Sequence, residues 1–344
     1  MKLLMITRKV DDSDALAGFT YNWVKKIGKN LEKLYVVTWQ KSDGTGLPNN
    51  IEIISLPNNK LTKVFFLKMN LLRLLPRVDG LFCHMNPEYT IISAPIAKIF
   101  RKKTVSWYTH KQVNIRRRLL EILTNKIVTA SSASFRNPLF PKKVEVINHG
   151  IDVDLFKPVD EKNDKTNFDI ISVGRISPTK DYESIILAIK KIGAKNIKFK
   201  LYGDVILKSQ KGYMNSLERM VDSFKLNNQV KFMGWVANRQ MPPHYQGADL
   251  FINMSGTGSV DKVVLEAMAS GCLVLTSNEA FEPILPKELM VEKNNPNALA
   301  EKIKWLRDLS ENEKIELRHK LRQEVVENHN LDNLAKKIIT QFKK

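Results

Sequence analysis

The sequence has few cysteines and no long apolar run. Only Cys83 and Cys272 occur among 344 residues, and both stand in apolar surroundings. Two cysteines do not make a disulfide framework, which favours a reducing compartment. No apolar run approaches the length of about 18 residues that a membrane-spanning helix needs. The first residues, MKLLMITRK, have too short an apolar run for a signal peptide and predict a strand. We therefore expect a cytoplasmic protein, with attachment to the inner face of the plasma membrane left open.

Acidic residues are scarce in the first half. Residues 1–150 carry 25 Lys and Arg against 10 Asp and Glu, a net charge of +15, and the remainder carries 30 against 26, a net charge of +4. This asymmetry indicates an anionic partner such as nucleic acid, a membrane or a phosphorylated acceptor, unless it serves solubility alone. Arg116-Arg117-Arg118 is expected to add to this basic surface. Lys60–Arg77 is apolar with recurring basic residues, so it predicts either a helix on a membrane surface or a helix packed on a sheet with a solvated basic face.

Short apolar runs alternate with helical spacing through both halves. Leu3–Thr7 and Phe168–Val173 are typical of buried parallel strands. The chain is too long for one typical core, and the loop at 148–158 is the best boundary. We therefore predict an α/β protein with two parallel sheets, divided into residues 1–150, residues 151–325 and a final helical segment at 326–344.

One stretch of the second half suits a phosphate. It reads GTGSVDKVVLEAMASGCLVL and contains Gly256 and Gly258 before a helix expected from about Asp261 to Gly271. Glycines let the backbone approach a ligand, and the first turn of a helix offers unpaired N–H groups to an anion. Glu266, on the same helix, could bind ribose hydroxyls. We interpret the stretch as half of a nucleoside-diphosphate site.

Further candidates follow other strands of the second half. Arg175 and Lys180 come after the strand that ends at Val173. An arginine can grip phosphate in a fork and a lysine adds a point charge, although both could be solvated charges at a helix start. Gly234-Trp235-Val236 follows another strand and could give main-chain contacts to a base.

Three residues of the first half stand at the end of a strand or the start of a helix, as the candidates of the second half do. His84 and His110 stand at the ends of successive strands, where ligands bind in open α/β sheets. Gly18 stands at the mouth of the first helix, where it could admit a phosphate or sugar or could only ease a turn.

These motifs resemble a known family. VGRISPTKDYESIILAI, FMGW and GTGSVDKVVLEAMASGCLVL, in that order, resemble the second domain of the GT-B retaining glycosyltransferases of family 4. INHGIDVDLFKP resembles the crossover between the domains of that family, and WYTH ends a strand where the family places a functional histidine. The resemblance implies two Rossmann-like domains that face each other across a cleft. It also implies that the nucleotide sugar binds the second domain, the acceptor binds the first, and the last helix crosses back to the first.

The resemblance gives roles to individual residues. It implies that Arg175 and Lys180 neutralise the diphosphate of a UDP- or GDP-linked sugar, that Glu266 holds the ribose and that His110 contacts the transferred sugar. Gly18 would close the cleft from the other side. Four residues would line the loop and helix start, with backbone N–H groups toward phosphate or sugar: Ser259, Asp261, Lys262 and Val263.

The sequence departs from the family at one position. The family has two glutamates separated by seven residues, and Glu266 matches the second, but Gly258 stands in place of the first. Asp261, three residues later, is the candidate to replace that carboxylate. The donor sugar is therefore left open.

The expected activity is metal-independent transfer of a hexose-type sugar, with retention of configuration, to a glycan or lipid-linked acceptor. Fixed positive charges at the diphosphate stabilise the leaving group, and no acidic metal cluster is evident. One alternative is a related enzyme, such as a nucleotide-sugar epimerase or phosphorylase. Another is a catalytically silent basic protein that binds nucleic acid, which we favour less because few aromatic residues interleave with the basic ones.

Overall fold

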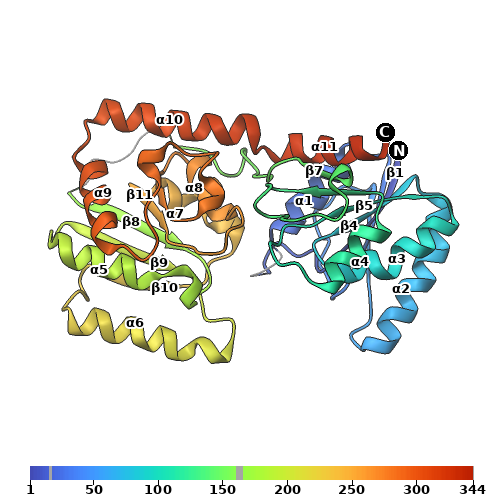
Figure 1. Ribbon diagram of the computed structural model, residues 1–344, viewed down its shortest axis with the longest axis horizontal. Coiled ribbons are helices and arrows are strands. Elements are labelled where there is room, and N and C mark those ends of the chain that lie inside the picture. Colours follow the sequence, from blue (N-terminus) through green and yellow to red (C-terminus); the bar gives the residue numbers. More distant parts are fainter. Residues whose placement is uncertain (15–17, 160–165, 344) are drawn as a thin grey trace. The chain divides into compact units, whose positions relative to one another are not determined.

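The chain folds into two compact units (Figure 1). The structure is a computed structural model that describes residues 1–14, 18–159 and 166–343, apart from the side chains of Lys60, Leu61 and Lys208. Unit 1 comprises Met1–Asp152, Ala237–Arg239 and Asn330–Lys344. Unit 2 comprises Val153–Val236 and Gln240–His329.

Unit 1 is built on a seven-stranded parallel sheet with the order β3-β2-β1-β4-β5-β6-β7. Its strands are β1 (Lys2–Thr7), β2 (Lys33–Thr38), β3 (Ile51–Ser55), β4 (Gly80–His84), β5 (Lys103–Trp107), β6 (Lys126–Thr129) and β7 (Val144–Val146). Its helices are α1 (Gly18–Lys29), α2 (Lys60–Leu74), η1 (Leu75–Arg77), α3 (Pro87–Ile99), α4 (Ile115–Leu123), η2 (Pro141–Lys143) and α11 (Leu331–Lys343).

Unit 2 has a five-stranded parallel sheet with the order β10-β9-β8-β11-β12. Its strands are β8 (Phe168–Val173), β9 (Ile197–Tyr202), β10 (Val230–Gly234), β11 (Leu250–Asn253) and β12 (Leu273–Thr276). Its α-helices are α5 (Tyr182–Ile192), α6 (Lys211–Ser223), α7 (Pro242–Gln246), α8 (Lys262–Ala269), α9 (Pro296–Asp308) and α10 (Glu311–Asn328). Its short 3₁₀ turns are η3 (Pro178–Lys180), η4 (Lys208–Gln210), η6 (Glu279–Phe281) and η7 (Lys287–Leu289). The turn η5 (Asn238–Gln240) belongs mainly to unit 1. The prediction of two parallel α/β sheets is confirmed.

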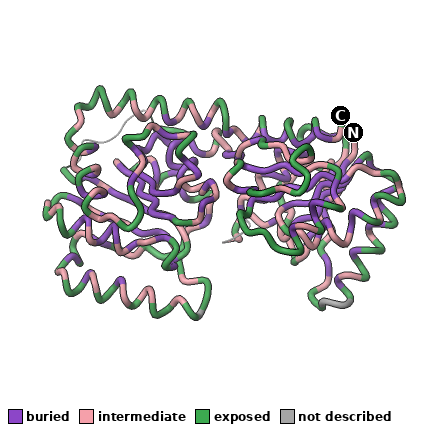
Figure 2. The backbone as a smooth tube through the Cα atoms, viewed as in Figure 1, coloured by how far each residue is buried: buried purple, intermediate pink, exposed green. Residues whose placement is uncertain are grey.

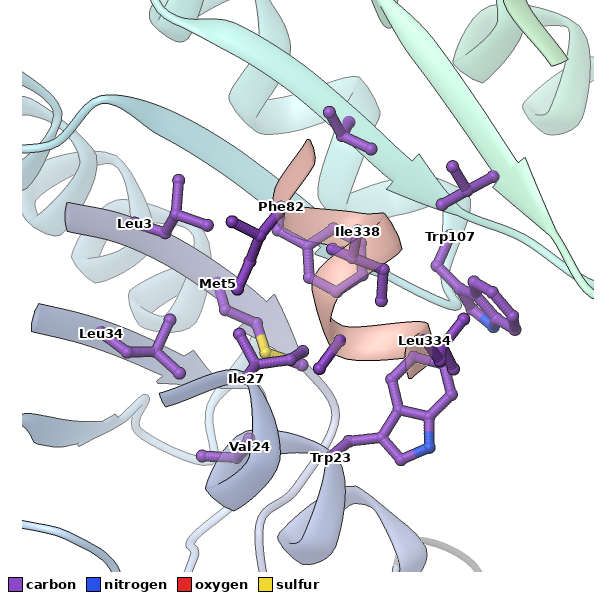
Figure 3. Close-up of a cluster of buried hydrophobic side chains, with 14 of the residues drawn as sticks. Leu3, Met5, Trp23, Val24, Ile27, Leu34, Phe82, Trp107, Leu334 and Ile338 are labelled. Atoms are coloured by element: carbon purple, nitrogen blue, oxygen red, sulfur yellow. The ribbon is translucent and has the colours of Figure 1, made fainter. Parts of the chain in front are cut away.

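Buried backbone is concentrated in the sheets, and exposed backbone follows the outer helices (Figure 2). The strands read as short apolar runs because helices cover both faces of a parallel sheet. In unit 1, one face packs against α1 and α11 (Figure 3). Trp23 and Trp107 meet edge to face there, with ring centroids 4.8 Å apart, and Leu334 and Ile338 of α11 lie in the same cluster. The last helix is therefore part of the unit 1 core.

The other face of the unit 1 sheet is covered by α2 and α3. Leu67, Leu71 and Leu74 of α2 are buried on this face. The side of α2 away from the sheet is also apolar, because Phe65 and Leu72 are 60% and 50% exposed. The helix thus packs on the sheet, as the second of the two predictions for Lys60–Arg77 required. It still presents apolar side chains outward.

Some basic residues do not belong to the surface that the sequence predicted. Lys63 is buried, with its ammonium nitrogen 5.4 Å from the ring centroid of Trp39. Arg117 is fully buried, and its guanidinium lies 3.9 Å from the ring centroid of Phe135 and pairs with Glu121 at 3.3 Å. Aromatic faces attract cations, which offsets part of the cost of burying these charges in unit 1. The side chain of Lys60 lies outside the described residues. Among those residues, no helix has the length and apolar character to cross a bilayer.

Candidate active site

Polar side chains gather at the carboxyl edge of the unit 2 sheet. Strand β8 lies beside β11, and β11 lies beside β12, all in parallel. The segments after these three strands therefore emerge at one edge, which is the usual ligand edge of an open α/β sheet. They carry Lys180 after β8, Ser255 after β11 and Asn278 after β12. Chain segments up to 98 positions apart thus meet in one cluster.

Lys180 is the central cation of the cluster. Its ammonium nitrogen lies 3.1 Å from Oδ2 of Asp261 and 3.3 Å from Oγ of Ser255. The side chains of Lys180 and Asp261 are only 10% and 16% exposed. Ser255 is fully buried. The lysine is therefore held in a defined position at the strand edge, as a fixed anion site requires.

Two asparagines that the sequence reasoning missed hold Asp261. The side-chain amides of Asn253 and Asn278 donate to Oδ2 of Asp261 at 3.3 Å and 3.4 Å. Asn278 also donates to the carbonyl of Ser259 at 2.7 Å. Both asparagines are buried at the ends of β11 and β12. Their position after apolar strands was the available signal, but no motif spacing marks them.

The start of α8 is open toward an anion. The helix begins at Lys262, one residue later than predicted, and its N-cap side chain does not cap it. In α5, by contrast, the carboxylate of Asp181 caps the helix by accepting a hydrogen bond from the N–H of Ser184. Asp261 occupies the N-cap position of α8, but its carboxylate makes no cap hydrogen bond and pairs with Lys180 instead. The N-cap side chain thus leaves the first turn of α8 uncapped, and a helix start of this kind suits a phosphate.

Glu266 occupies a separate, buried part of α8. It is 4% exposed and accepts a hydrogen bond from the hydroxyl of Tyr245 at 3.2 Å. Burial and the neighbouring Glu266 hold the pKa of Tyr245 well above its usual value, so the phenol stays a donor. The ammonium nitrogen of Lys262 is buried, although the residue as a whole is half-buried. This burial lowers the pKa of Lys262 well below its usual value, while Glu266 opposes the shift.

Tight turns bring the strand ends together. Gly203 has φ of +154°, and a Cβ on it would lie 1.8 Å from the carbonyl oxygen of Gly174, so only glycine fits there. Arg175, next to Gly174, is exposed and makes no side-chain hydrogen bond or ion pair with a described residue. Gly234 and the 44% exposed Trp235 end β10, and Val236 is half-buried. These residues leave main chain and one cation accessible at the same sheet edge.

The position where the resembled family has a glutamate has a left-handed backbone. Gly258 has φ of +65° and is buried, in the loop between β11 and α8. A glutamate would be strained in this conformation. Gly256, two residues earlier, is exposed, and its N–H donates to the carbonyl of Thr179 at 3.1 Å. The loop is thus tied to the turn that carries Lys180.

The candidates of unit 1 are not brought together. His84 is buried in the aromatic cluster beside Trp23, and its Nδ1 lies 3.0 Å from Oγ1 of Thr7. His110 is exposed and lies edge-on against Tyr108, with ring centroids 5.4 Å apart. Gly18 is the first residue of α1, and a Cβ there would lie 3.1 Å from the carbonyl oxygen of Asp12. Close packing on the preceding loop thus favours glycine, and residues 15–17 of that loop lie outside the described residues.

A hollow of about 700 Å³ opens elsewhere on unit 2, at the end of β12. Its lining has charges of both signs, includes Ser277 and contains none of Lys180, Asp261 and Glu266. Four of its lining residues are acidic and three are basic, and it lies apart from the start of α8, so the polar cluster remains the candidate site. Within the described part of the chain, no group of three or more His, Cys, Asp or Glu side chains could hold a metal ion.

Comparison with known proteins places this geometry in a family. Residues 154–339 match the family model described as glycosyl transferases group 1. The protein belongs to this family. The match covers the whole polar cluster, and the two parallel α/β sheets agree with the GT-B fold of glycosyltransferases.

Relatives support the same assignment. The chain is 27% identical over 142 residues to mannosylfructose-phosphate synthase of Agrobacterium fabrum, over 38% of this chain and 31% of that protein. It is 25% identical over 112 residues to alpha-monoglucosyldiacylglycerol synthase of Streptococcus pneumoniae, over 33% and 24%. These matches thus span about a quarter to a third of the relatives' length. Among solved structures, Anabaena HepE in complex with UDP matches over 100% of both chains, with a TM-score of 0.81 and 17% identity.

Proposed function

We propose that the protein transfers a hexose-type sugar from a UDP- or GDP-linked donor to a glycan or lipid-linked acceptor, with retention of configuration. The carrying observation is the ion pair between Lys180 and Asp261, the N-cap residue of α8, at one sheet edge. Similar solved structures of HepE hold UDP and UDP-glucose, and two relatives are named for sugar-phosphate and glycolipid synthesis. These names support a nucleotide-sugar donor.

Each group at the site has a proposed role. Lys180, the exposed Arg175 and the N–H groups of α8 stabilise the charge that develops on the departing diphosphate. Glu266 binds the ribose, and His110 contacts the transferred sugar. The acceptor attacks the face that the phosphate leaves, and the phosphate takes the acceptor's proton. This fixed protein charge supports metal independence as part of the proposal.

A ligand screen tests the donor part. Thermal melts with UDP, GDP and their sugars should show stabilisation of about 2.7 kcal/mol at about 100 times the Kd. Transfer is then measured with and without acceptor, because an epimerase needs no acceptor and a phosphorylase needs phosphate. Lys180→Ala and Glu266→Ala should each severely reduce transfer in a folded protein. Near-normal turnover in both variants would remove the site assignment, and transfer or hydrolysis of any nucleotide sugar would exclude a catalytically silent binding protein.

We also propose that unit 1 attaches to an anionic membrane through α2. At about 100° per residue, Phe65, Met69 and Leu72 share one side of the helix, and each is at least 50% exposed. Lys68 and Arg73 are exposed and flank that side. An apolar stripe between basic residues suits a helix lying in the plane of an anionic bilayer.

The membrane part has its own test. Phe65→Ser with Leu72→Ser should lower binding to anionic vesicles by roughly tenfold or more, because apolar side chains would no longer leave water. Ile315→Ser with Trp305→Ser removes two exposed apolar side chains of unit 2 and is the matched control. Equal binding by both variants would contradict attachment through α2.

A further inference from the structure

A second basic feature of unit 1 lies away from His84 and His110. A hollow of about 550 Å³ is formed by the end of α3, the turn into β5, the end of α4 and Lys143 of η2. It opens at the amino edge of β5 and β6, whereas His84 and His110 follow the carboxyl ends of their strands. It is therefore not part of the site described above.

The lining of the hollow is strongly cationic. Half of its ten described lining residues are basic, and none is acidic. The basic residues are Lys98, Arg101, Lys102, Lys103 and Lys143. So many like charges around one concavity raise its potential and favour an anion.

Three of these cations are available to a ligand. The side chains of Lys98, Arg101 and Lys102 make no hydrogen bond or ion pair within the part of the chain that the structure describes. Arg101 also has a left-handed φ of +54°, at a helix end where glycine is the usual residue.

Lys143 forms a fixed wall of the same hollow. Its ammonium group donates to the carbonyls of Glu121, Ile122 and Thr124 at 2.9, 3.2 and 2.9 Å. These are unpaired carbonyls at the end of α4, which a cation satisfies. Burial lowers the pKa of Lys143. Lys143 is thus fixed on one side of the hollow, and Lys98, Arg101 and Lys102 line the rest of it without a described partner.

Apolar side chains stand beside these charges. Ile99, next to Lys98, is 76% exposed, and Ile122, which lines the hollow, is 54% exposed. Helix α3 also packs against α2, the helix with the outward apolar stripe (Figure 1). A site for nucleic acid would offer aromatic rings to stack on bases, and the described lining has none. Cations next to exposed aliphatic side chains fit the boundary between lipid headgroups and acyl chains.

We propose that this hollow binds the phosphate headgroup of an anionic membrane lipid. Lys98, Arg101 and Lys102 contact the phosphate, and Ile99 and Ile122 enter the adjoining apolar layer. The inference rests on the membrane attachment proposed above and adds a defined headgroup site to it.

Charge-reversal variants test the headgroup site. The triple variant Lys98→Glu, Arg101→Glu, Lys102→Glu is compared with the full-length wild type in co-sedimentation with phosphatidylcholine vesicles, with and without phosphatidylglycerol. Each basic residue near an anionic surface strengthens binding, so the triple variant should lose roughly 100-fold in partition onto the anionic vesicles. The control is Lys195→Glu, Lys211→Glu, Lys231→Glu, which makes the same charge change at exposed lysines of unit 2. It should lose no more than about threefold, because salt screens distant charges.

Three results would overturn the inference. Equal losses in both triple variants would mean that only net charge matters. Equal binding of wild type to both kinds of vesicle would mean that no anionic headgroup is recognised. Retained vesicle binding with loss of binding to a single-stranded oligonucleotide would assign the hollow to nucleic acid. Thermal melts with UDP keep the two proposals apart, because the hollow variant should keep the wild-type shift. No shift of the wild type with either UDP or GDP would count against the transferase proposal alone.

Discussion

Replacing Lys180 with alanine removes its ion pair with Asp261 and should affect ligand binding and stability by different amounts. In the proposed site, the lysine would provide a charged hydrogen bond, worth about 1.5–3 kcal/mol, to a bound diphosphate. Its loss should weaken UDP binding by roughly 10- to 150-fold. Transfer should fall by at least about 10²-fold, because the developing charge of the leaving group loses a fixed partner.

The same change should lower stability only moderately. A buried ion left without any partner costs about 3–5 kcal/mol. Asp261 would keep the amide donors of Asn253 and Asn278, so we expect a loss of about 1–3 kcal/mol. Adding Asp261→Asn to Lys180→Ala should restore most of this stability but only part of the UDP affinity, since it removes the unpaired charge but returns no cation.

Isothermal titration with UDP and chemical denaturation measure these two effects. Lys231→Ala, at an exposed lysine on the edge strand β10, is the control for a generic loss of charge. A UDP Kd within about threefold of wild type in folded Lys180→Ala would refute the reasoning, because a charged hydrogen bond cannot be lost at so small a cost.

Three further predictions concern the surroundings of Lys180. Asp261→Asn should strengthen UDP binding by removing a negative charge beside the diphosphate, yet it should slow transfer. Titration with UDP and a transfer assay measure the two effects. Faster transfer would dismiss Asp261 as the replacement for the missing glutamate. Asn278→Ala should weaken UDP binding by roughly tenfold, about one hydrogen bond, because Asp261 and the loop lose a donor; unchanged affinity would contradict this positioning role. Gly203→Ala should cost about 1–3 kcal/mol in backbone strain alone, measured by denaturation. Gly212→Ala, in open space on α6, is its control and should be neutral or stabilising, so equal losses would refute the steric argument.

The strands were predictable from the sequence for a physical reason, and the central candidate site residues could be proposed from it. A parallel strand buried on both faces is a short apolar run, and β8 was therefore predictable to its last residue. Lys180 and Glu266 stand in local motifs with fixed spacing. Asn278 could not be found in this way, because its role depends on β12 lying beside β11 rather than on a local pattern.

The count of basic residues in the first half did not show which individual charges lie on the surface. Lys63 and Arg117 count as surface charges in the sequence, yet each packs on an aromatic ring in the interior. The aromatic partner of Lys63 is 24 positions away, and that of Arg117 is 18 positions away. Pairings at such distances are set by the tertiary fold, so composition alone cannot show which charges reach solvent.

The place of α11 in the unit 1 core has a consequence for biosynthesis. A ribosome synthesises residues 1–152 first. Helix α11, which covers one face of their sheet together with α1, follows only after all of unit 2. During that interval Phe82, Trp107 and their neighbours lack the cover of Leu334 and Ile338. The nascent first unit must therefore wait, exposed to chaperones or to aggregation, until its final helix emerges.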